Sequence, residues 1–161
     1  QNQIDGAWVP EPWGTRLLQE ASGSEFIDER KTWPNGKFIT TLVVASTKIL
    51  TERPDLVRKF LEAHVDSITF IRTQAAQAKA LSNKEIERVT TNPLPAKVID
   101  AAFKNVDFTY EPLAQTLFKQ ADFAYNLGFL GTTKPDLSGL YDLTILNEVL
   151  KAKKLAVVSA S

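Results

Sequence analysis

The residues best suited to chemistry in this chain lie in one short segment. Trp8 and Trp13 flank Glu11. Indole rings with a polar edge, together with a carboxylate, are side chains that a small polar ligand meets in a closed cleft. The preceding run, residues 4–9, predicts a buried β-strand. We call residues 8–13 the elbow, because they would turn the chain at the end of a strand, where α/β proteins bind ligands.

A second interpretation of the elbow needs no ligand. Glu11 lies just before Pro12, at the start of a predicted helix, where a carboxylate interacts favourably with the helix dipole. In this case Glu11 caps the helix, and both indoles pack in the core. The sequence leaves both interpretations open.

Signatures of enzymes and metal sites are missing from the rest of the sequence. The chain has no cysteine, which excludes disulfides, thiolate catalysis and Cys-based metal sites. Its single histidine, His64, falls on the apolar face of a predicted helix, which favours a core histidine over a general base. No GxSxG, Walker or GxGxxG motif occurs. We therefore expect no catalytic residues, no metal and no cofactor.

The composition narrows the choice of partners. The 161 residues suit about one domain, and 19 Lys and Arg balance 19 Asp and Glu. Zero net charge argues against nucleic acid and against a polybasic membrane surface as partners. No apolar run is long enough to span a bilayer. There is no signal peptide, which decides nothing about export, because a cleaved chain would look the same. Methionine is absent as well as cysteine, either by chance or because the protein economises on sulfur.

The elements that would position the elbow are strands and a series of helices. A short helix is expected from Trp13 to about Gly23, followed by a short strand over residues 24–30 and a loop over residues 31–37. Residues 38–46 are β-branched and apolar with little alternation, which predicts a central, doubly buried strand. Beyond it the pattern is helical, with a frayed tail. The expected helices begin at Pro54 and, after a break at Ser82 and Asn83, cover residues 83–91, 95–106, 112–130 and 143–154.

Several motifs resemble one family. IDGAWVPEPWGTRLL (4–18) resembles the Asp-Ala-Trp-x-x-Glu-Pro-Trp segment of periplasmic solute-binding proteins of ABC importers. The similar group captures aliphatic sulfonates, taurine, nitrate or bicarbonate. Residues 38–71 are similar to that family's return strand and Pro-Asp-Leu-Val helix, and LSGLYDLTILNEVL (137–150) resembles its C-terminal signature. The likeness covers nearly the whole chain but only the second half of such a protein.

The resemblance implies an α/β fold, as part of a two-lobe (type II-like) periplasmic binding protein that is helix-rich after one buried strand. Residues 1–37 would end lobe two, including the cleft wall and the hinge approach, and residues 38–161 would return into lobe one. Much of the site would then come from a preceding half. The implied ligand-binding residues are Trp8, Glu11 and Trp13, with Thr40 or Thr41 at the hinge strand.

The resemblance also implies a function. The chain would be the substrate-binding component of an ABC importer, capturing a small organic anion, with an aliphatic sulfonate favoured slightly by the missing sulfur residues. Because Glu11 repels an oxyanion at contact distance, it would serve an amine end of the ligand or fix a neighbouring donor. The implied partners are the anion and a membrane permease, and the complete protein would be a monomer, either periplasmic or exported and membrane-anchored.

Other functions stay open at this point. One is a nitrate- or bicarbonate-type binding protein. Another is an enzyme on the same fold, similar to the proteins that make the thiamine pyrimidine, although those depend on a histidine and other residues in their N-terminal half. A third is a helical interaction module that shares the fold.

Overall fold

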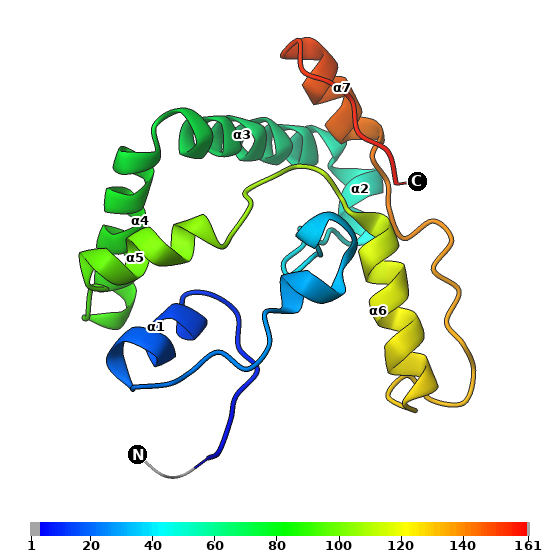
Figure 1. Cartoon of the computed structure of the whole chain (residues 1–161). Helices are drawn as coiled ribbons and strands as arrows, with labels where there is room; N and C mark the ends of the chain where they lie inside the picture. The colour runs from blue at the N-terminus through cyan, green and yellow to red at the C-terminus, as the bar shows by residue number, and fades with distance from the viewer. Residues whose placement is uncertain (1–3, 161) are drawn as a thin grey trace. The chain divides into compact units, whose positions relative to one another are not determined.

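The computed structural model of the protein describes residues 4–160 and consists of helices joined by irregular segments (Figure 1). Its chain divides into two compact units. Unit 1 is Gln1–Asp28 with Ile68–Phe108, and unit 2 is Glu29–Ser67 with Thr109–Ser161. The helices are α1 (Trp13–Glu20), α2 (Thr47–Glu52), α3 (Pro54–Thr73), α4 (Ala75–Thr90), α5 (Ala96–Lys104), α6 (Ala114–Asn126) and α7 (Thr144–Ala152), with the 3-10 turns η1 (Glu29–Thr32) and η2 (Pro34–Gly36).

The predicted α/β fold is wrong. Residues 4–160 contain no strand, so the strands expected over residues 4–9, 24–30 and 38–46 are irregular or helical turns instead. A β-strand is stable only when a neighbouring strand pairs with its backbone, and no described segment provides one. Val43 and Val44 were expected to be buried on both faces of a sheet, yet they are 52% and 87% exposed. The predicted lobes, 1–37 and 38–161, stay a prediction.

Most of the predicted helices are confirmed. The helices that follow the elbow, begin at Pro54, or fall within residues 95–106, 112–130 and 143–154 are α1, α3, α5, α6 and α7. The break expected at Ser82 and Asn83 is wrong, because α4 continues through both residues. Asn83 does not cap a new helix. Its side chain instead donates to Leu94 O (2.9 Å) and accepts from Leu94 N (2.7 Å), which folds the following segment back along α4.

Unit 1 is held together by α5, which contacts both α1 and α4. The apolar face of α5 buries Val98, Ile99 and Ala102, and Ala78 of α4 is buried too. Lys79 of α4 forms an ion pair of 2.7 Å with Asp100 of α5. The start of α1 is therefore supported by one neighbouring helix, α5, and this contact positions the elbow.

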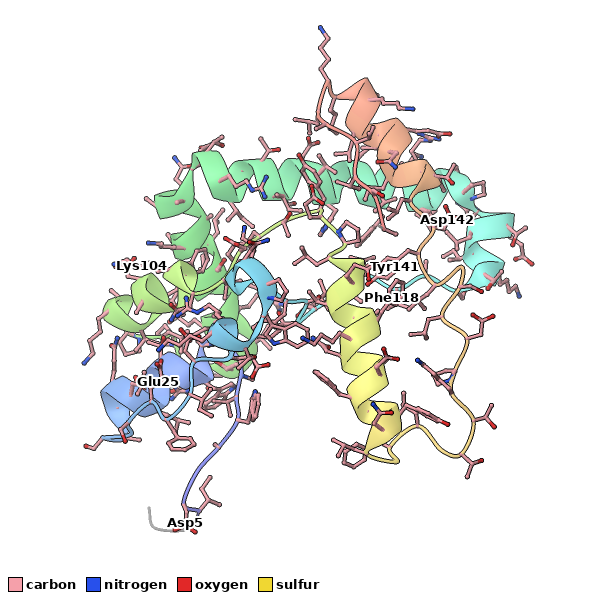
Figure 2. All side chains as sticks on the ribbon, turned by 45° about the vertical axis from the view of Figure 1, so that its right-hand side comes forward. Asp5, Glu25, Lys104, Phe118, Tyr141 and Asp142 are labelled. Carbon is pink, nitrogen blue, oxygen red and sulfur yellow. The ribbon has the colours of Figure 1, made fainter. Side chains whose placement is uncertain are left out.

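Unit 2 contains an apolar core, which lies where α7 packs on α3. Its buried members are Val65, Leu146, Val149, Leu150 and Val158. Leu150 and Val65 have no exposed surface. Lys153, directly after α7, pairs with Asp66 of α3 at 2.6 Å, at the edge of this core. Elsewhere in unit 2 the Phe118 and Tyr141 rings, both labelled in Figure 2, meet edge to face with 5.9 Å between centroids.

The C-terminal segment is fixed rather than frayed as the sequence predicts. The Asn147 side chain donates to Val158 O (3.0 Å) and accepts from Val158 N (2.9 Å). An amide side chain can pair with both groups of one peptide unit in this way, as a strand neighbour would. These two bonds hold Val158 against α7, where its side chain is 6% exposed.

Replacing Asn147 with alanine should therefore release the segment after α7. The Asn147→Ala variant leaves the N–H and C=O of Val158 without their partners, so we expect the free energy of unfolding to fall by about 1–3 kcal/mol. Urea denaturation followed by far-UV circular dichroism measures this loss. Asn126→Ala, at the exposed end of α6, is the matched control and should change stability by no more than about 0.5 kcal/mol. Equal effects of the two variants would mean that Asn147 does not hold the segment.

A carboxylate at the start of α7 predicts a pH dependence. Asp142 accepts a hydrogen bond from Thr144 N (2.9 Å), and this bond, followed by that of the Thr144 hydroxyl, holds the pKa of the Asp142 carboxyl below its usual range. A lowered folded-state pKa means that the stabilisation is present above the unfolded-state pKa and is lost as the pH falls through the folded-state pKa. Asp142→Ala should therefore lower the urea midpoint at pH 7 and have little effect near pH 2, well below the ordinary aspartate pKa of about 3.9.

The control for this prediction is Asp5→Ala. Asp5 is exposed and far in sequence from any helix end, so its replacement should shift the urea midpoint equally little at both pH values. A penalty for Asp142→Ala that stays constant from pH 7 to acid would show that the charge of Asp142 is not what stabilises α7.

Candidate functional site

The Glu11 carboxylate caps α1. Its Oε2 accepts a hydrogen bond from Thr15 N (3.1 Å), and its Oε1 accepts one from Thr15 Oγ1 (3.0 Å). The first N–H groups of a helix lack partners within the helix, and a side-chain oxygen placed there satisfies one of them. Thr15 is 3% exposed, so the contact lies at the base of the helix and not on its outer face.

The same carboxylate also joins two helices. Asn105, directly after α5, donates from Nδ2 to Glu11 Oε1 over 2.7 Å. Lys104, the residue before Asn105 and the last residue of α5, is labelled in Figure 2. Glu11 thus accepts hydrogen bonds from three donors on two elements of unit 1. Its carboxylate fixes α1 on α5, and little of its hydrogen-bonding capacity is left for a ligand.

The two indoles of the elbow lie on the surface. Trp8 is 82% exposed and Trp13 is 53% exposed, so they do not pack in the core as the capping interpretation requires. The Arg16 guanidinium carbon lies 4.6 Å from the centre of the Trp13 ring, and Arg16 Nε pairs with Glu20 Oε2 at 2.9 Å. The elbow therefore presents two exposed aromatic rings, and the half-buried Arg16, paired with Glu20, lies against one of them.

Thr40 and Thr41, the other predicted ligand residues, belong to unit 2. Both are exposed, in the irregular segment between η2 and α2. That segment is attached to α6 at Ile39, whose N–H donates to Thr116 Oγ1 (3.0 Å) and whose C=O accepts from Gln120 Nε2 (3.1 Å). Trp8, Glu11 and Trp13 belong to unit 1, and their part in ligand binding also stays a prediction. The part played by Thr40 and Thr41 stays a prediction.

Three residues that lie close to the elbow were not predicted from the sequence. Arg16 follows Trp13 by three residues, a spacing that brings side chains together on a helix, so this pair could have been found. Thr15 could have been found in the same way, as a residue of the first helical turn. Asn105 could not, because 94 residues separate it from Glu11 and only the packing of α5 on α1 brings it there.

The predicted core histidine, His64, is half-buried on α3, with its ring stacked on Phe60 at 6.1 Å between centroids. Within residues 4–160, no group of three or more His, Cys, Asp or Glu side chains could hold a metal ion. No helix in this described range is both long and apolar enough to cross a membrane.

Comparison with known proteins gives one family. The model of the NMT1-like family matches residues 1–84, which is more than half of the 161-residue chain and includes the whole elbow. The chain belongs to the NMT1-like family. This is the family of ABC-type sulfonate, nitrate and bicarbonate binding proteins. No curated protein and no solved structure matches the chain.

Membership of the NMT1-like family has general consequences. The family consists mainly of substrate-binding proteins, which are not enzymes, and these bind a small ligand and work with an ABC transporter permease. They are usually periplasmic or exported. The coarse functional prediction from the elbow, a solute-binding protein of an ABC transporter, therefore agrees with the family.

Proposed function

We propose that this protein is the substrate-binding component of an ABC importer and captures an aliphatic sulfonate. The observation that carries the proposal is the family match over the elbow, where both indoles are exposed and the Trp13 ring lies beside the Arg16 guanidinium. An alkanesulfonate has an apolar chain, which suits Trp8 and Trp13, and an anionic head, which suits Arg16. Guanidinium groups bind oxyanions with two parallel N–H donors, and Arg16 keeps its terminal nitrogens outside its pair with Glu20.

In this proposal Glu11 does not contact the ligand. It fixes α1 on α5 and so sets the positions of Trp13 and Arg16 on the first two turns of that helix. This role agrees with electrostatics, because a carboxylate at contact distance would repel the sulfonate oxygens. The proposed partner is the permease of the importer, and the proposed location is periplasmic or exported and membrane-anchored.

Nitrate and bicarbonate are the nearest alternatives. Neither has an apolar chain, so neither would use the two exposed indoles. Nothing in the described residues favours an enzyme similar to the thiamine-pyrimidine synthases, since His64 is stacked on Phe60 without a catalytic partner among the described contacts.

Titration calorimetry with a panel of ligands tests the proposal. We expect saturable binding of taurine and alkanesulfonates, tighter for longer alkyl chains, with little or no heat from nitrate or bicarbonate. Trp13→Ala should weaken binding of a long alkanesulfonate at least tenfold, about 1.4 kcal/mol. Phe26→Ala is the matched control, because Phe26 is also in unit 1, is 96% exposed and lies outside the elbow. The absence of heat with every ligand, or equal losses in the two variants, would contradict the proposal.

A further inference from the structure

Glu20 is the last residue of α1, and the stability of that helix does not explain its charge. The carboxyl end of a helix carries a partial negative charge, which disfavours a carboxylate there and favours a cation. Glu20 pairs with Arg16, four residues earlier, but a pair with the cation nearer the amino end is the weaker order on a helix. The negative charge of Glu20 therefore lies where helix formation alone would favour a neutral or positive residue.

Glu20 and Trp13 together hold the guanidinium of Arg16. Arg16 Nε donates to Glu20 Oε2 over 2.9 Å, and the guanidinium carbon lies 4.6 Å from the centre of the Trp13 ring. The side chains of Arg16 and Glu20 are 35% and 30% exposed, so both charges are partly shielded from water. A guanidinium also has two terminal nitrogens with donors of their own, which are not part of this hydrogen bond.

The charges of Arg16 and Glu20 cancel, and this affects anions of different charge differently. An anion bound by the terminal nitrogens of Arg16 is attracted by the guanidinium and repelled by the nearby Glu20 carboxylate. Both energies are proportional to the charge of the anion, so a dianion is repelled by Glu20 twice as strongly as a monoanion. A dianion also loses more hydration on binding, and the guanidinium, opposed by Glu20, offsets less of that loss.

We propose that Glu20 is a specificity-determining residue, which makes the site at Arg16 select singly charged oxyanions over doubly charged ones. A sulfonate carries one negative charge at neutral pH, whereas sulfate, which has a similar head, carries two. Rejection by like charge is a general way in which a binding site discriminates between similar ligands. The inference rests on the proposed function, because it takes Arg16 as the residue that binds the anionic head.

Three variants separate the charge of Glu20 from its hydrogen bond. Glu20→Gln keeps an oxygen that can accept from Arg16 Nε but removes the charge. Glu20→Asp keeps the charge on a shorter side chain. Glu25→Gln is the matched control, because Glu25 is also in unit 1, is exposed and lies outside α1. Glu20→Gln should leave the helical circular dichroism unchanged, because a neutral residue suits the end of α1 at least as well.

Calorimetric titration with pentanesulfonate, alone and in competition with sulfate, gives the dissociation constants of both anions. We expect Glu20→Gln to strengthen pentanesulfonate binding about threefold and sulfate binding by about the square of that factor, roughly tenfold. Glu20→Asp and Glu25→Gln should keep the ratio of the two dissociation constants found for the unmodified protein. The change in this ratio should shrink between about 0.01 M and about 1 M sodium chloride, because salt screens the repulsion.

An unchanged ratio in Glu20→Gln, with pentanesulfonate binding intact, would overturn this proposal and leave the proposed function standing. An equal change in Glu25→Gln, an equal change in Glu20→Asp, or a change that salt does not reduce would overturn it in the same way. If the unmodified protein and all three variants bind no pentanesulfonate, the proposed function fails, and the selectivity assigned to Glu20 fails with it.

Discussion

Leu150→Ala is expected to lower the free energy of unfolding by about 2–5 kcal/mol. Leu150 has no exposed surface and lies in the core between α7 and α3, beside Val65 and Val149. Removing three carbons there loses the favourable free energy of burying them and leaves a cavity in the core. Domains of this size are stable by only about 5–15 kcal/mol, so the loss is a large part of the total.

Urea denaturation followed by far-UV circular dichroism measures this effect. The matched control is Leu127→Ala at the end of α6, where the leucine is 72% exposed, and its expected change is within about 0.5 kcal/mol. A loss below about 1 kcal/mol for Leu150→Ala, or equal losses at the two leucines, would mean that the cluster around α7 does not stabilise the protein.

Glu11→Ala is expected to lower the free energy of unfolding by about 1–3 kcal/mol. The change removes the acceptor of three hydrogen bonds, and Thr15, which donates two of them, is almost fully buried. Glu11→Gln should lower the free energy of unfolding by less, because its amide oxygen still accepts hydrogen bonds. Some loss remains, because its NH2 group takes the place of an acceptor and faces a donor. Glu25→Ala, at an exposed glutamate of unit 1 labelled in Figure 2, is the control and should be nearly neutral.

The Glu11→Gln variant separates two roles for Glu11 in ligand binding. If Glu11 positions α1, Glu11→Gln should weaken the binding of taurine and of a simple alkanesulfonate by the same factor. A loss confined to taurine would instead mean that Glu11 contacts the amine of the ligand. Comparing the two dissociation constants by calorimetry decides between these roles, whatever the effect on stability.

The helices could be predicted from the local sequence pattern, whereas the local pattern alone does not determine whether a strand forms. α3 begins at Pro54 and α7 carries its apolar residues at helical spacing, so the information for each lies within the helix itself. Residues 38–46 have the β-branched composition of a strand, but a strand also needs a partner that its own sequence does not contain. Local preference and final structure therefore differ at Val43 and Val44.

Short-range signals were also overlooked or outweighed. Ser46 caps α2, and this helix was not predicted because Ser46 was assigned to the strand over residues 38–46. Asn83 has the residue type of a helix cap, yet its hydrogen bonds go to Leu94, eleven residues further along the chain. Asn147 makes the same kind of pair with Val158. A side-chain amide has several possible partners, and the sequence alone does not rank them.

The candidate site could be predicted in part. Trp8, Glu11 and Trp13 could be named from their types and spacing, and their role in binding a ligand stays a prediction. The role of Glu11 could not be predicted, because it depends on the distant Asn105. The exposure of the two indoles could not be predicted either. The elbow thus has the helix cap of one interpretation and the accessible aromatic rings of the other.

The most direct test of the central claim, that the elbow belongs to a sulfonate-binding protein, is one calorimetric titration of the protein with pentanesulfonate. We expect saturable binding with one ligand per chain, unchanged by excess nitrate. No heat of binding, or binding that nitrate competes away completely, would contradict it.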